Sequence, residues 1–197
     1  MAVIHQTTLV PSKLELLAGW LPGQDWYAGQ PGGLGLAKAG GFRLDDPAGD
    51  VGIEFMVVRD DAARAVAAYL VPMTYRASPL ARAEAALIGT SEHGVLGKRW
   101  IYDGTQDPVL LTQLAELIQG RAEAQAQSQS NTPDRTVHAV PAAAAPGQGL
   151  SISFARRLSE AADDAGLPGV GEVTGLWTAP DGTLIRSLFV TARPAID

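Results

Sequence analysis

We begin with Gly49-Asp50-Val51-Gly52-Ile53-Glu54-Phe55-Met56-Val57-Val58-Arg59. Polar and apolar side chains first alternate along this stretch and then become continuously apolar, a pattern that favours a β-strand with at least one buried face. Residues 67–75 repeat the texture. The preceding residues 45–49, Asp-Asp-Pro-Ala-Gly, are typical of a turn because Asp and Pro preset turn geometry and Gly accepts positive φ. The sequence therefore predicts an antiparallel sheet.

Two helices are expected beside this sheet. Ser12 and Glu15 have the spacing of a capping box, which predicts a helix from about residue 13 to residue 20. Asp107 and Pro108 have the residue types of an N-cap and a first helical position. The leucines that follow recur at helical spacing, so a second amphipathic helix should run from there towards residue 120.

The texture of the sequence changes after residue 120. Residues 121–149 are rich in Ala, Gln, Ser, Pro and Thr without apolar periodicity, which predicts a loop or linker. The next stretch, 150–158, is ambiguous between strand and helix. Residues 170–178 and 183–191 flank Ala-Pro-Asp-Gly and predict a C-terminal β-hairpin. An exposed edge of this hairpin would favour strand pairing with a second copy, so a homodimer is one expected state.

Composition excludes several classes of function. The 197 residues include no cysteine, so no disulfide or thiolate nucleophile is available, and a reducing cytoplasm fits best. The net charge of −6 argues against a nucleic-acid partner, because phosphate binding needs clustered Lys and Arg. No apolar run reaches the roughly 20 residues of a membrane span, so neither membrane insertion nor export is expected.

Four aromatic residues are the candidate ligand-binding side chains. Trp26 and Tyr27 could stack on the apolar face of a sugar, with the neighbouring Gln and Asp donating and accepting hydrogen bonds. Trp100 and Tyr102 alternate on one face of an expected strand and could form a second platform. The alternative for both pairs is packing within the core, because aromatic side chains bury a large area each.

No catalytic, cofactor or metal site is expected. The glycine clusters lack the spacing of a dinucleotide or phosphate loop. The three histidines, His5, His93 and His138, are far apart and have no partner at metal-ligand spacing. Ser91, Glu92 and His93 could in principle do acid–base work, but local hydrogen bonding in a turn is the simpler interpretation.

Two stretches carry a family resemblance: residues 19–29, Gly-Trp-Leu-Pro-Gly-Gln-Asp-Trp-Tyr-Ala-Gly, and residues 86–108, which include Ala-Leu-Ile-Gly, Val-Leu-Gly and Tyr-Asp-Gly-Thr-Gln-Asp-Pro. Together they resemble the N-terminal cap of actinobacterial maltokinases. The resemblance implies an α+β fold, with a curved antiparallel β-sheet packed by one or two helices, to which the C-terminal hairpin is added. It suggests a cap-like domain over residues 1–120, the loop or linker over 121–149, and a β-rich segment over 150–197 that either completes the same sheet or stands apart.

The catalytic set of such a kinase is not found. Residues 128–132, Ser-Gln-Ser-Asn-Thr, resemble the phosphate loop of maltokinases, and residues 156–158 resemble the segment after their nucleotide-binding lysine. Ser153 stands near the place of that lysine and cannot supply its charge. The resemblance therefore implies a non-catalytic accessory or regulatory protein of α-glucan, trehalose or maltose 1-phosphate metabolism, whose partner is an enzyme of that metabolism. A small-molecule or sugar-binding module and a split or degenerate sugar kinase lobe are the alternatives.

Overall fold

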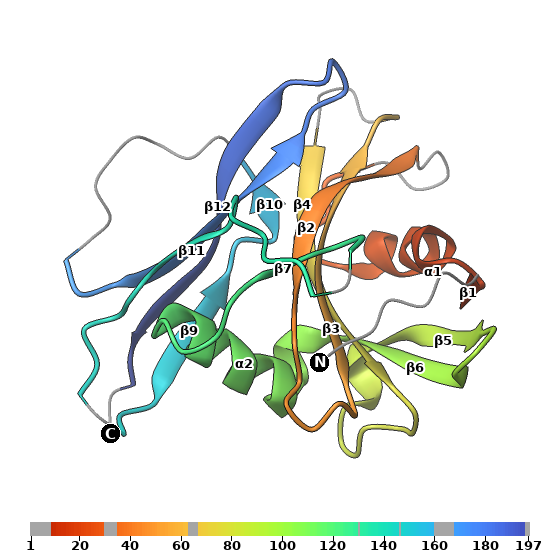
Figure 1. Ribbon diagram of the computed structural model, residues 1–197. Helices are drawn as coiled ribbons and strands as arrows, with labels where there is room; N and C mark the ends of the chain where they lie inside the picture. Colours follow the sequence, from red (N-terminus) through yellow and green to blue (C-terminus); the bar gives the residue numbers. More distant parts are fainter. Residues whose placement is uncertain are drawn as a thin grey trace.

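The computed structural model describes residues 9–29, 35–62, 67–129, 131–145, 147–159 and 168–195. Within these ranges the chain is mostly antiparallel β-sheet with two short α-helices, in agreement with the expected α+β class. Figure 1 shows the helices α1 (Lys13–Trp20) and α2 (Pro108–Ile118) on opposite sides of the central strands.

The centre of the sheet is a meander of three strands, β2 (Leu36–Leu44), β3 (Gly52–Asp60) and β4 (Ala67–Arg76). The predicted turn between the first two is confirmed: the Asp46 carboxylate accepts hydrogen bonds from the backbone N–H groups of Ala48, Asp50 and Val51. Towards the α1 side the sheet continues through β6 (Gly97–Asp103), β5 (Leu87–His93) and β1 (Leu9–Val10).

The other end of the sheet is formed by β11 (Gly171–Thr178), β12 (Leu184–Pro194) and β9 (Leu150–Phe154). Strand β11 joins β2 at a single residue pair, Trp177 opposite Gly40. A Cβ atom on Gly40 would lie 2.8 Å from the Leu176 carbonyl oxygen, and its φ is +155°, so only glycine allows this approach. Three short strands lie beside the main order: β7 (Gln125–Ala126) on β2, β8 (His138–Val140) on β11, and β10 (Arg157–Leu158) on β4.

Both helices begin as the sequence predicts. Ser12 and Glu15 form the capping box of α1, and Asp107 caps α2 with Pro108 in its first turn. Three short 3₁₀ segments, η1 (Leu21–Gly23), η2 (Glu84–Ala86) and η3 (Gly104–Gln106), complete the described helical structure.

Two hydrophobic cores lie on the two faces of the central strands. Alternate residues of β3 divide between them: Phe55 contributes to the core under α2, and Met56 to the core under α1. The α2 core also receives Phe189 from β12, whose ring stacks 6.3 Å from that of Phe42. The strands β11, β12 and β9 therefore share one core with β2, β3 and α2.

The structure also describes much of residues 150–158 and 121–149, whose conformation the sequence left open. Residues 150–158, ambiguous between strand and helix, are two strands, β9 and β10, separated at residues 155–156. The 121–149 segment is mostly irregular where it is described, and β7 and β8 attach it to the sheet.

Candidate functional site

The first aromatic pair lies in the loop after η1 and packs on β4. The Trp26 ring lies 5.9 Å from the Tyr69 ring and 5.8 Å, edge-on, from the Trp20 ring. Tyr27 lies 5.2 Å from Tyr69, and its hydroxyl donates a 2.7 Å hydrogen bond to Asp60. Burial and this carboxylate raise the pKa of Tyr27 well above its ordinary value. The pair therefore joins the loop to the α1 core.

The second aromatic pair lies on the face of β6 that is turned away from the α1 core. Trp100 and Tyr102 flank Ile101, which belongs to the α1 core, so their side chains point away from it. Tyr102 is 3% exposed, and its hydroxyl accepts a hydrogen bond from the Leu80 backbone N–H. The Lys98 ammonium lies 5.1 Å from the Trp100 ring. The structure does not bring the two aromatic pairs together.

Arg156, in the segment between β9 and β10, lies over the ring of Trp26. Its guanidinium lies 5.0 Å from the Trp26 ring, forms an ion pair with Asp103, and donates a 3.3 Å hydrogen bond to the Thr105 hydroxyl. Its Nη1 atom is buried and has no hydrogen-bond partner among the described residues. The loop aromatic, the end of β6 and the segment between β9 and β10 therefore meet at one side chain.

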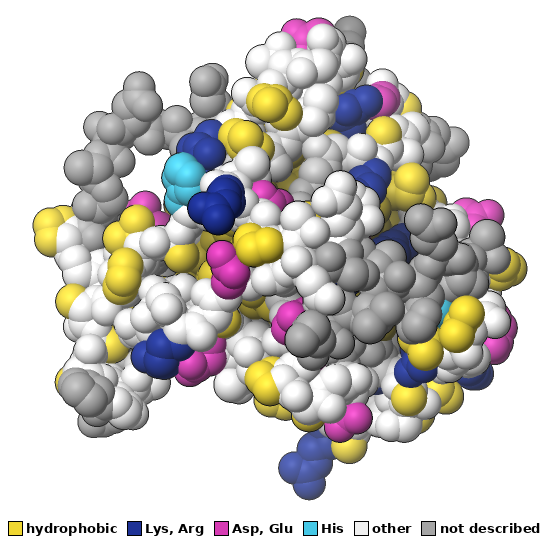
Figure 2. Space-filling view, viewed as in Figure 1, with side chains coloured by type: hydrophobic (Ala, Val, Ile, Leu, Met, Phe, Trp, Pro, Cys, Tyr) yellow, Lys and Arg dark blue, Asp and Glu magenta, His cyan; other side chains and the backbone are white. Residues whose placement is uncertain are grey.

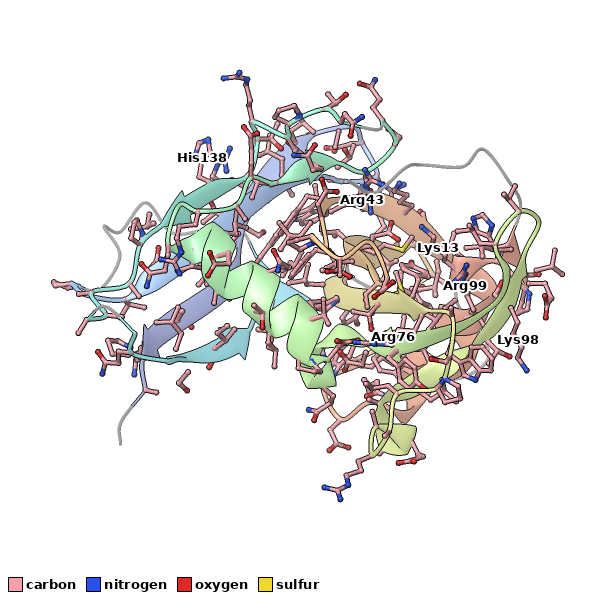
Figure 3. All side chains as sticks on the ribbon, turned by 60° about the horizontal axis from the view of Figure 1, so that its bottom comes forward. Lys13, Arg43, Arg76, Lys98, Arg99 and His138 are labelled. Atoms are coloured by element: carbon pink, nitrogen blue, oxygen red, sulfur yellow. The ribbon has the colours of Figure 1, made fainter. Side chains whose placement is uncertain are left out.

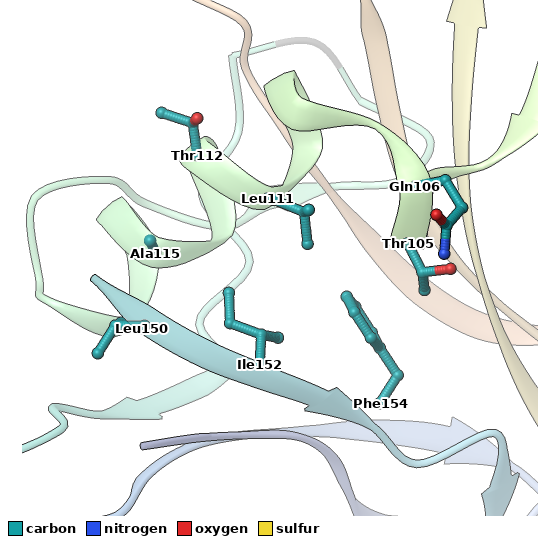
Figure 4. Close-up of a pocket in the computed structure, with 8 residues that line it drawn as sticks. All are labelled: Thr105, Gln106, Leu111, Thr112, Ala115, Leu150, Ile152 and Phe154. Carbon is teal, nitrogen blue, oxygen red and sulfur yellow. The ribbon is translucent and has the colours of Figure 1, made fainter. Parts of the chain in front are cut away.

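An open groove of about 500 Å³ begins beside this arginine, between α2 and β9. Figure 4 shows Leu111, Thr112 and Ala115 on the helix side and Leu150, Ile152 and Phe154 on the strand side. Thr105 and Gln106 of η3 line the end nearest Phe154. The lining carries no charged side chain, so the groove offers mainly apolar contact, with Thr112 on the helix side and two polar side chains at the end nearest Phe154.

A buried carboxylate is held on the α1 face of β3. Glu54, 3% exposed, accepts hydrogen bonds from the Lys13 ammonium and the Tyr75 hydroxyl, both at 2.5 Å, and from the Gln127 amide at 2.8 Å. Burial by itself raises the pKa of Glu54, but attraction to Lys13 and these hydrogen bonds outweigh it and leave the pKa below its usual value. Figure 3 shows Lys13 and Arg43 over the same part of the sheet.

A second buried carboxylate ends the 3₁₀ segment before α2. Asp107 is fully buried and accepts two 2.7 Å hydrogen bonds from the Arg76 guanidinium, together with one from the Val109 backbone N–H. Burial opposes ionisation, but the fork from Arg76 and the helix N-terminus lower the pKa of Asp107. Every hydrogen bond of this carboxylate goes to a structural partner.

The described residues contain no cluster of three His, Cys, Asp or Glu side chains that could hold a metal ion. Ser153 is exposed on β9. Asn131, with φ of +52°, lies in the stretch that resembles a phosphate loop. Ser130 of that stretch and His5 lie outside the described residues. His93 accepts hydrogen bonds at its Nδ1 from the N–H groups of Val95 and Leu96, the local turn role expected for it.

The surface offers no other concentrated feature on the face shown. Figure 2 shows basic and acidic side chains interspersed there, without a large patch of either sign among the described residues. None of the helices in the described ranges has the length and apolarity to cross a membrane.

Comparison with known families places the central part of the chain. Residues 20–107 match the maltokinase N-terminal cap domain. This segment, less than half of the 197 residues, is similar to that cap domain. The matched segment begins at Trp20, includes β2 to β6 and η3, and ends at Asp107, the N-cap of α2. No kinase domain family was found for the chain, and no curated protein matches it.

The groove is built across the boundary of the cap domain. Thr105 and Gln106 belong to the cap, whereas α2 and β9 lie outside the matched residues. Sequence reasoning missed the groove because its two sides are nearly 40 residues apart. One signal was present: Leu150, Ile152 and Phe154 alternate with serines, the period of a half-buried strand.

Proposed function

We propose that this chain is a non-catalytic accessory module that binds a maltokinase-like enzyme of α-glucan and trehalose metabolism and regulates it. The carrying observation is the cap domain over residues 20–107, a unit whose family is defined by its place in front of a kinase. In the proposed role the chain works in the cytoplasm, without a cofactor of its own.

The polar groups of the described structure support binding over catalysis. Glu54 and Asp107 are buried, and lysine, tyrosine, glutamine and arginine side chains already occupy their oxygens. Phosphoryl transfer needs a cation on the phosphates and carboxylates free to hold magnesium and orient the acceptor hydroxyl. Both carboxylates instead hold helices and strands in place.

The test uses the purified chain and a maltokinase whose own N-terminal cap has been removed. Binding is measured by biolayer interferometry, and maltose phosphorylation by the release of ADP. We expect saturable binding and a change in the KM or kcat of the truncated kinase. A natural maltokinase with its cap in place is the matched control, because its docking surface is already covered. The absence of both binding and a kinetic effect would contradict the proposal.

A parallel assay addresses the alternative of a kinase lobe. The chain alone, incubated with ATP, magnesium and maltose, should release no ADP above the rate of a buffer control. Turnover that Asn131→Ala abolishes would replace the accessory role with an enzymatic one.

A further inference from the structure

The groove between α2 and β9 runs along a free edge of the sheet. In the strand order β9 is the last member, and among the described strands only β12 pairs with it. The opposite end of the order is β1, which has only two residues and is followed by Pro11. Short edges and prolines limit pairing with another chain, whereas β9 has five residues and neither proline nor charge.

The hydrogen bonds at the two ends of β9 show which backbone groups face outward. Ala155 N–H donates to the Phe189 carbonyl, and Ala195 N–H donates to the Gly149 carbonyl. In an antiparallel pair the backbone groups of every second residue bond to the partner strand. The N–H and C=O groups of Ser151 and Ser153 therefore face β12. The N–H and C=O groups of Leu150, Ile152 and Phe154 therefore point to the free edge.

The same three residues line the groove with their side chains. Across it lie Leu111 and Ala115 of α2, one helical turn apart. The groove thus combines a row of outward backbone donors and acceptors with an apolar wall on each side. This combination matches an extended chain, whose own backbone alternates in the same way and whose side chains alternate between two faces.

We propose that this groove binds an extended, uncharged peptide segment of a partner protein, which adds a strand to β9 and places alternate apolar side chains between Ile152 and Leu111. The neutral lining favours uncharged side chains, since a charge there would lose water without gaining a partner. Thr105 and Gln106 supply hydrogen-bonding groups at the end nearest Phe154.

The geometry favours a peptide over a second copy of this chain. Helix α2 flanks the free edge, so an incoming strand has no room for a neighbouring strand on its far side (Figure 4). In a second copy of the chain, β9 is already paired with β12, so both strands would have to enter the space beside α2. The five-residue edge spans only roughly 17 Å, which is short for an interface of the roughly 1,600 Å² that stable complexes bury.

The experiment uses a library of capped peptides seven residues long, with Leu, Ile, Val or Phe at alternate positions and Ser or Thr between them. Binding is measured by fluorescence anisotropy with the full chain. We expect members that bind with a Kd on the order of 10–100 μM, and amide shifts of Leu150, Ile152 and Phe154 in NMR spectra. No binding by any member up to about 1 mM overturns the proposal.

Two N-methylated forms of the best peptide separate strand pairing from simple filling of the groove. Methyl groups on one alternating set of amides block the hydrogen bonds to β9, and those on the other set face away from it. One form should lose at least about tenfold in affinity and the other less than about twofold. Equal losses would overturn the strand-addition geometry.

A protein variant provides the complementary test. Ala115→Arg fills the groove from the α2 side and should weaken binding at least about tenfold, whereas Ser151→Ala, on the opposite face of β9, should leave it unchanged. The peptide comparison needs no variant, so it holds even if Ala115→Arg fails to fold. A concentration-dependent dimer in analytical ultracentrifugation that Ala115→Arg dissociates would replace the peptide with a second copy.

Discussion

The two faces of the central strands are covered in different ways. On one face, the loop after α1 brings Trp26 and Tyr27 into contact with Tyr69, Trp20 packs on Trp26, and the Tyr27 hydroxyl donates a hydrogen bond to Asp60. On the other face, α2 buries one side of its helix and leaves an open groove towards β9. The aromatic residues of the loop thus pack against the α1 core, whereas aliphatic, aromatic and uncharged polar side chains line the open groove.

Removing Trp26 should have the largest effect. Trp26→Ala deletes a ring that contacts Trp20, Tyr69 and Arg156, and we expect a loss of about 3 kcal/mol in the free energy of unfolding. Urea unfolding followed by circular dichroism measures it. A stability within about 0.5 kcal/mol of the wild type would mean that the ring is free for a ligand.

Glu54→Gln tests the polar side of the same face. It removes the charge that holds Lys13 and Tyr75, and we expect a loss of about 2 kcal/mol, less than for a fully buried pair because the Lys13 side chain is 34% exposed. Lys13→Met should cost more than Glu54→Gln, because it leaves the buried carboxylate without its counter-charge, whereas Glu54→Gln leaves a partly exposed lysine that water can solvate. Unfolding at pH 7 gives both values, and a larger loss in Glu54→Gln would contradict that order.

The pH dependence of stability follows from the same carboxylates. The folded-state pKa values of Glu54 and Asp107 lie below the ordinary 4.5 and 3.8, so their contribution is present above those values and is lost as the pH falls through and below them. Tyr75 acts at the other extreme, because its pKa is raised well above 10.0 and its contribution is lost only in strong alkali. We expect the urea concentration at the midpoint of unfolding to decrease as the pH is lowered below about 4.5. The decrease should be smaller in Glu54→Gln. An equal fall in both proteins would assign the effect to other groups.

The smallest effect is expected in the groove. Leu111→Ala should cost about 1 kcal/mol or less, because this side chain faces the groove, whereas Leu114→Ala on the buried side of α2 should cost about 3 kcal/mol. The pair differs only in which face of one helix is altered. Equal losses would show that the groove side is as tightly packed as the core side.

Local signals allowed much of this fold to be predicted. The capping box at Ser12 and Glu15, the Asp-Pro start of α2 and the turn at Asp46 each depend on residues within five positions of one another. Such patterns fix a backbone conformation without help from the rest of the chain.

Contacts between distant residues were beyond the same reasoning. Residues 150–158 were ambiguous between strand and helix from sequence, and the pairing of β9 with β12 and its position beside α2 depend on residues nearly 40 positions away. Arg156 was noted for its place in a kinase-like segment, and its contacts with Trp26 and Asp103 come from two other parts of the chain. Neither contact has a sequence spacing that would reveal it.

Asp107 connects the matched segment to the helix that follows it. It is the last residue of the matched cap, yet it holds Arg76 of β4 and starts the helix that covers Phe42 and Phe55. A fragment cut at that residue would expose the aromatic side of the sheet to water and leave the helix-starting carboxylate without its helix. The end of the matched segment is therefore not a position at which this chain can be cut without uncovering the core that α2 closes.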